Sequence, residues 1–65
     1  MSKFKDNLKE LRVSAGLTQK QFAQSIGVLE RTVSYWEKGS RECDFDTLIK
    51  IAKYFSVSVD DLLLE

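Results

Sequence analysis

A chain of 65 residues, of which 43% are apolar and 31% charged, is long enough for one small domain, and at this size folding buries only about 60% of the surface of the unfolded chain. One cysteine and no histidine exclude an internal disulfide and remove most metal sites and most nucleophile–base pairs, so we expect neither an enzyme nor a cofactor. The sequence has no signal peptide and no apolar run long enough to span a bilayer, which predicts a cytoplasmic protein without membrane contact.

The formal charge is zero over the whole chain, but the charges are unevenly distributed. Residues 1–41 carry eight basic and four acidic side chains, a net charge of +4, whereas residues 42–65 carry two basic and six acidic ones, a net charge of −4. A basic first part favours a nucleic-acid partner. An ordinary solvated surface explains the same charges equally well, so charge alone does not decide between the two.

Apolar residues recur at helical spacing along the chain, and start and stop signals divide this pattern into five short helices. The first helix is expected from about Ser2 to Ala15, followed by Gly16 as a left-handed cap. Its predicted apolar face consists of Phe4, Leu8, Leu11 and Ala15. The second helix starts at Thr18, where Gln21 three residues later predicts a capping box, and stops at Gly27.

The third helix is expected from about Glu30 to Lys38, with Gly39 as its terminator. Asp44 is a suitable N-cap for a fourth helix, and Ser58 with Asp61 predicts a capping box for a short fifth one. The residues predicted to be buried in these three helices are Val33, Trp36, Leu48, Ile51, Ala52, Phe55, Leu62 and Leu63. Helices this short are unstable alone, so we expect a single compact all-α bundle over residues 1–65.

The middle of the chain resembles the Cro-like (Xre, phage-repressor) helix-turn-helix family. The resemblance rests on the segments LTQKQFAQSIGV (residues 17–28) and TVSYWEKG (residues 32–39). The segments TLIKIAK (residues 47–53) and VSVDDLL (residues 57–63) are similar to the last two helices of the family, so the resemblance covers residues 8–63.

The resemblance implies a lambda-repressor-like bundle of five helices, in which the second and third form a helix-turn-helix. It further implies a sequence-specific transcriptional regulator, most often a repressor, that binds a two-fold-symmetric operator as a homodimer through the major groove of double-stranded DNA. The alternative from another class is a protein-interaction module such as an antitoxin or adaptor, and an antitoxin usually binds DNA as well.

If Val33 and Trp36 face inward, the third helix turns Glu30, Arg31, Ser34, Tyr35 and Lys38 outward. Arg31 is the best candidate for reading a base, because a guanidinium fits the O6 and N7 acceptors of guanine. Glu30 can accept from cytosine N4, support Arg31 or repel phosphate. Tyr35 can contact a thymine methyl or a phosphate, and Ser34 is within reach of either a base or a phosphate.

Phosphate contacts are expected from the start of the second helix and from the basic residues around the motif. Gln19 matches a position at which the family contacts phosphate, and helix N-termini also present backbone N–H groups to anions. Lys20, Lys38 and Arg41 are candidates by location, although each can equally serve as a solvating charge. The resemblance pairs Arg12 with Glu37 in an ion pair that shows one edge of Arg12 to phosphate.

Three positions depart from the family pattern, namely Leu29 in place of a Ser or Thr cap, Cys43 in place of a proline and Ser56 in place of a glycine. A left-handed Ser56 would be mildly strained. Phe45 and Ile49 lie off the buried stripe of the fourth helix, and Leu64 remains from a run of three leucines. These three are the expected dimer interface, with scattered surface hydrophobes as the alternative.

Overall fold

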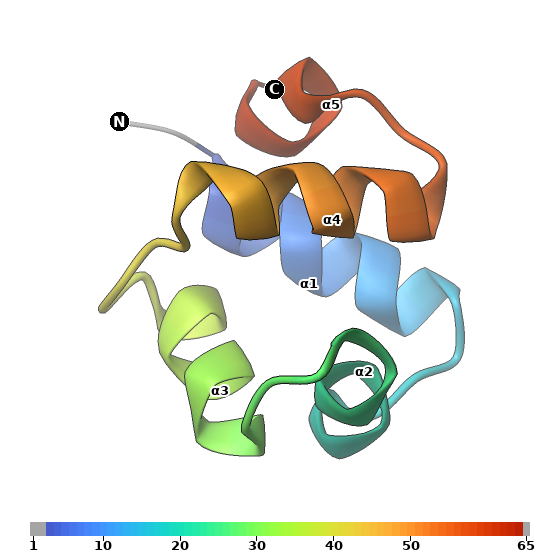
Figure 1. The fold of residues 1–65 in the computed structure, drawn as a ribbon, viewed down its shortest axis with the longest axis vertical. Helices are drawn as coiled ribbons and strands as arrows, with labels where there is room; N and C mark the ends of the chain where they lie inside the picture. Colours follow the sequence, from blue (N-terminus) through green and yellow to red (C-terminus); the bar gives the residue numbers. More distant parts are fainter. Residues whose placement is uncertain (1–2, 65) are drawn as a thin grey trace.

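The computed structural model describes residues 3–64 and folds them into five helices, with no strand in that range. The helices are α1 (Phe4–Ser14), α2 (Gln19–Ile26), α3 (Glu30–Lys38), α4 (Phe45–Phe55) and α5 (Val59–Leu63). Figure 1 shows α2 and α3 together at one end of the molecule and α5 at the other, with α1 and α4 between them. The predicted all-α bundle of five helices is therefore confirmed. Over this range no helix is long and apolar enough to cross a membrane.

The first helix is shorter than predicted, and its inner face keeps the buried Phe4 and Leu8 and the partly buried Leu11 but also contains Arg12. Its expected start at Ser2 lies outside the described residues, and Lys3 occupies the N-cap position. The prediction that Ala15 belongs to the buried face is wrong, because α1 ends at Ser14 and Ala15 is exposed. The chain turns away at Gly16, which has a φ of 75°. The buried stripe instead runs at a spacing of four residues and consists of Phe4, Leu8 and Arg12.

Both ends of α2 carry local capping signals, whereas the start of α3 lacks a side-chain cap. The capping box at the start of α2 is present, because the Thr18 hydroxyl accepts from the backbone N–H of Gln21 while the Gln21 side chain accepts from that of Thr18. α2 ends at Gly27, whose φ of 77° is left-handed. Leu29 stands at the N-cap of α3 without a side-chain cap bond, a loss worth about 1 kcal/mol.

The core lies where the five helices meet. Its buried apolar residues are Phe4, Leu8, Phe22, Ala23, Ile26, Val33, Trp36, Leu48, Ile51, Ala52 and Leu62. The rings of Phe4 and Trp36 pack edge to face with centroids 6.2 Å apart, and those of Phe22 and Phe55 stack at 5.3 Å. Trp36 therefore belongs to the core as predicted, Phe22 is also buried there, and the half-buried Phe55 packs against the core.

The last two helices are joined by a strained turn and closed by a contact with α1. Ser56, the C-cap of α4, has a left-handed φ of 57°. The predicted capping box between Ser58 and Asp61 is present. The side-chain amide of Asn7 in α1 donates to the carbonyl oxygens of Asp61, Leu62 and Leu64 at 3.2, 3.1 and 2.7 Å. One side chain of α1 thus satisfies the carbonyl end of α5.

Candidate nucleic-acid interface

The outward face of α3 carries the residues that the sequence predicts for reading bases. Glu30 and Arg31 are exposed in the first turn of the helix, and Tyr35 is 38% exposed one turn later. Ser34, between them, is half-buried. The opposite face of α3 is fixed in the core, because Val33 and Trp36 are 0% and 4% exposed. The helix therefore has one side anchored and one side available to a partner.

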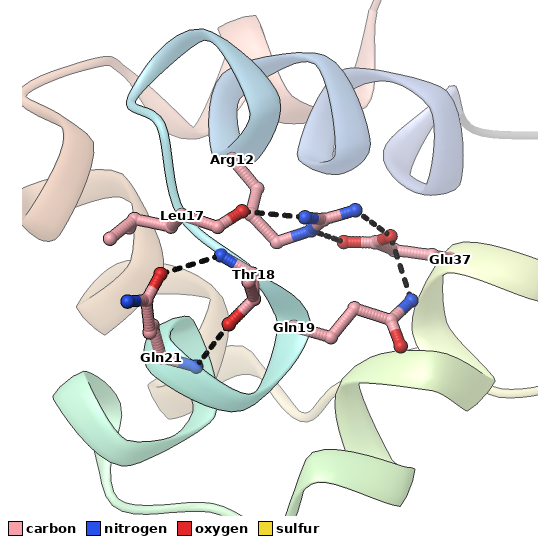
Figure 2. Close-up of polar contacts among 6 residues, drawn as sticks. All are labelled: Arg12, Leu17, Thr18, Gln19, Gln21 and Glu37. Atoms are coloured by element: carbon pink, nitrogen blue, oxygen red, sulfur yellow. Dashed lines mark hydrogen bonds and ion pairs between the residues drawn. The ribbon is translucent and has the colours of Figure 1, made fainter.

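A buried ion pair holds the end of α3 to α1 (Figure 2). The Nε and Nη2 atoms of Arg12 donate to the two carboxylate oxygens of Glu37 at 2.7 and 3.0 Å, and Nη1 donates to the carbonyl oxygen of Leu17 at 2.7 Å. The side chains of Arg12 and Glu37 are only 10% and 4% exposed. Hydrogen bonding to Glu37 raises the pKa of Arg12, against the opposing effect of burial. The ion pair implied by the resemblance is therefore present.

The same carboxylate also holds a side chain of α2. The Gln19 amide nitrogen donates to the Glu37 oxygen Oε1 at 3.1 Å, and Figure 2 shows the Gln19 side chain pointing at Glu37. Glu37 thus accepts from both α1 and α2 and ties them to α3. Because the Gln19 amide nitrogen has a second N–H, its predicted contact with phosphate is compatible with this bond and stays a prediction.

The turn that ends α3 brings Arg41 back onto Tyr35. The backbone N–H groups of Ser40 and Arg41 donate to the carbonyl oxygen of Tyr35 at 3.0 and 3.4 Å. The Arg41 guanidinium lies over the Tyr35 ring, 5.2 Å from its centroid. A residue predicted to bind phosphate and one predicted to read a base are therefore in direct contact.

Lysines from outside the motif cover the ends of its two helices. The Lys50 Nζ lies 3.9 Å from the position that a Cβ would take on Gly27, at the end of α2. The Lys5 side chain passes over Gly39, where an added Cβ would meet its Cδ at 2.8 Å. A positive charge near the carbonyl end of a helix stabilises it. The exposed Lys20 and Lys38 add to the charge of the motif, and their phosphate contacts stay predictions.

The predicted dimer residues belong to two elements. Phe45 and Ile49 lie one turn apart on α4, and Leu64 follows α5. Phe45 and Leu64 are 68% and 61% exposed, whereas Ile49 is half-buried. A single chain leaves large apolar side chains in solvent at both places, which is compatible with the predicted interface.

Three contacts around the site have no sequence signal. The bonds of Asn7 to the end of α5 span 54 to 57 residues, and the bond of Gln19 to Glu37 spans 18. The stacking of Arg41 on Tyr35 depends on two side-chain rotamers that periodicity does not define. The one sequence signal near this contact is Gly39, which indicates a turn after α3 and has a left-handed φ in the structure.

Two helices joined by a tight turn, the second anchored by one face and exposed on the other, define the class of helix-turn-helix proteins. A model of the helix-turn-helix family matches residues 8–62. The chain belongs to this family, in its Xre/Cro-like branch. The resemblance seen in the sequence is therefore confirmed.

Similar proteins include a transcriptional activator and a transcriptional repressor. The chain is 38% identical over 60 residues to the HTH-type transcriptional activator BcrR of Enterococcus faecalis, covering 92% of this chain and 29% of that protein. It is 33% identical over 60 residues to the cryptic phage CTXphi transcriptional repressor RstR of Vibrio cholerae, covering 92% of this chain and 54% of that protein. A crystal structure of a transcriptional regulator from Listeria innocua superimposes with a TM-score of 0.90 at 36% identity, over 97% of this chain and 59% of that one. The chain spans about half or less of the first curated relatives that it matches.

Proposed function

We propose that this chain is the DNA-binding domain of a transcriptional regulator and reads its operator by placing α3 in the major groove. The observation that carries the proposal is the difference between the two faces of α3, one of which is buried and the other exposed. Its inner side is buried at Val33 and Trp36 and tied down through Glu37. Its outer side presents Glu30, Arg31 and Tyr35. A rigid helix with polar side chains on its open face is what base reading requires.

The finer proposal is a repressor that acts as a homodimer on a two-fold-symmetric operator. One α3 contacts only a few base pairs, which is too little information to select a site in a genome, and a dimer doubles it. A dimer that covers a promoter blocks polymerase by occupancy and needs no activating surface. The names of the relatives include both an activator and a repressor, so the sign of regulation requires its own measurement.

Selection of bound sites from a random DNA pool tests the reading face. Arg31→Ala should weaken binding to the selected site by about 1–3 kcal/mol and relax the preference at one base position. Lys38→Ala removes the same charge from the same helix and is the matched control. It should weaken all sequences alike and flatten the salt dependence. A selected site that Arg31→Ala leaves unchanged would refute this reading face.

A promoter assay then tests repression. With the selected site placed over a promoter, transcription should fall as the protein is added, and the Arg31→Ala variant should need a higher concentration for the same effect. A rise in transcription would show activation instead. A chain without any salt-dependent DNA binding would refute the DNA-binding proposal and support the protein-interaction alternative.

A further inference from the structure

The contact between Arg41 and Tyr35 is produced by the turn that ends α3. Gly39 has a left-handed φ of 79°, and beyond it the N–H groups of Ser40 and Arg41 converge on the carbonyl oxygen of Tyr35. This turn keeps Arg41 beside the last turn of α3. It places the Arg41 guanidinium 5.2 Å from the centroid of the Tyr35 ring.

Stacking leaves the hydrogen-bonding capacity of the arginine intact. A guanidinium over an aromatic ring uses its flat face, whereas its N–H donors point outward from the edge. Arg41 is exposed, so it can lie on Tyr35 and bind a phosphate oxygen at the same time. Tyr35 is 38% exposed, so part of its surface stays open to a partner while Arg41 lies over the ring.

We propose that Arg41 is a positioning residue for Tyr35 and that the two side chains act as one unit in sequence recognition. Arg41, fixed at a phosphate, holds the ring in one orientation against its base pair. Arg41 therefore contributes to base preference through Tyr35, in addition to its charge. This inference rests on the proposed function of α3 as the reading helix.

The contact itself is measured by NMR in the free protein. The δ protons of Arg41 should shift upfield because they lie over an aromatic ring. Tyr35→Leu should abolish this shift, whereas Tyr35→Phe, which keeps the ring, should preserve it. An Arg41 signal that does not respond to Tyr35→Leu would overturn the proposal whatever the protein does on DNA.

The consequence for recognition is measured on a panel of operators that differ by single base pairs. Arg41→Lys keeps the charge but lacks the flat face, so it should retain the salt dependence of binding. It should reduce discrimination at the base pair read by Tyr35 by at most about 5-fold, the full worth of an exposed cation–π contact, because lysine keeps part of the attraction to the ring. In the Tyr35→Leu background, the same substitution should cause no further loss of discrimination. Lys38→Ala is the comparison for a contact with phosphate alone, and it should weaken every operator equally.

Two failures are distinguishable. If Arg41→Lys weakens all operators equally while Arg31→Ala still alters base preference, Arg41 is only a phosphate contact and the proposed function stands. If the wild-type protein discriminates between no operators, the proposed function fails and this proposal fails with it, and the NMR shift then reports a purely structural contact.

Discussion

Ser56 is the one residue other than glycine that adopts a left-handed conformation within residues 3–64, with φ 57° and ψ 43°. Glycine takes this conformation without the steric cost that a Cβ imposes. We therefore expect Ser56→Gly to raise the free energy of unfolding by about 0.5–1 kcal/mol, after the greater chain entropy of glycine is subtracted. Urea denaturation of the two proteins measures the difference.

Ser56→Ala is the matched control, because it keeps the Cβ and removes the hydroxyl. It should be no more stable than the wild type. If Ser56→Ala were stabilised as much as Ser56→Gly, the strain would not come from the backbone conformation.

The raised pKa of the Cys43 thiol predicts that the free energy of unfolding changes with pH in the alkaline range. Burial raises the pKa of its thiol from 9.0 to about 11, and the neighbouring carboxylates of Asp44 and Glu42 act in the same direction. A raised pKa in the folded state means that the unfolded chain ionises first. The associated stability is complete below pH 9 and is lost as the pH rises toward 11.

We expect the free energy of unfolding of the wild type to fall more steeply between pH 9 and 11 than that of Cys43→Ala, which lacks the titrating group. The comparison cancels every other ionisation, because the two proteins share all of their remaining groups. Alkylation with iodoacetamide at pH 8 should also be slower in the folded protein than in urea, because the thiolate is the nucleophile. Equal slopes for the two proteins would contradict the raised pKa.

Among the helices, α5 is the shortest, with five residues, and depends on Asn7. The Asn7 amide donates to three carbonyl oxygens at its end, and the backbone N–H of Lys3 donates to Leu63 at 2.9 Å. Asn7→Asp replaces the donor with an acceptor of the same shape, so we expect a loss of about 1–3 kcal/mol. Hydrogen exchange should show the largest change in α5.

Asn7→Ala separates the two effects of that substitution. It removes the bonds without placing a carboxylate against carbonyl oxygens, so it should cost less than Asn7→Asp. An Asn7→Asp variant with native exchange rates in α5 would show that the helix does not depend on the Asn7 bonds.

Because Arg12 and Glu37 form a buried ion pair between α1 and α3, we expect their substitutions to have strongly coupled effects on the free energy of unfolding. Removing one partner leaves a buried charge, which costs about 3–5 kcal/mol. Arg12→Ala and Glu37→Ala should each destabilise the fold, and the double variant should lose clearly less than the sum. Denaturation of the four proteins gives the coupling energy. The milder pair Arg12→Lys and Glu37→Gln serves if the alanine variants do not fold, and strictly additive losses would contradict the interaction.

The helices could be predicted because their signals are local. Thr18 with Gln21, and Ser58 with Asp61, are spaced for capping boxes, and both boxes are present. Ala15 was wrongly predicted to lie on the buried face of α1. The helical spacing of apolar residues continues to Ala15, whereas the helix itself ends at Ser14. Arg12 is charged, so hydropathy does not identify it as buried, and only the family resemblance paired it with Glu37. The bond from the second partner of that carboxylate, Gln19, depends on how α2 and α3 cross, which a single sequence does not specify.

At the scale of the whole molecule, we expect a homodimer on DNA. Its half-sites should lie about 10–10.5 bp apart, or a multiple of that spacing. Sedimentation of the wild type and of Ile49→Glu, with and without the selected site, measures assembly. The substitution should weaken the dimer because it places a charge in the predicted interface with Phe45 and Leu64. Val13→Glu makes the same change at a residue that is 57% exposed on α1 and should leave assembly unaffected.

A wild type that remains monomeric on its selected site would contradict the dimer. A selected site without two-fold symmetry would do so independently. Dimerisation unaffected by Ile49→Glu would move the interface away from α4 without refuting assembly.

Because Trp36 is packed in the core, its fluorescence reports whether the protein is folded. Trp36 is the single tryptophan of the chain, and it lies on the buried side of α3 with its ring against Phe4. Its fluorescence should therefore be blue-shifted in the native state and move to longer wavelength when α3 separates from α1. Because the indole faces away from the side chains that we propose read bases, DNA should leave this emission almost unchanged. A variant that no longer binds DNA but keeps the native emission has therefore lost a contact with DNA and not its fold.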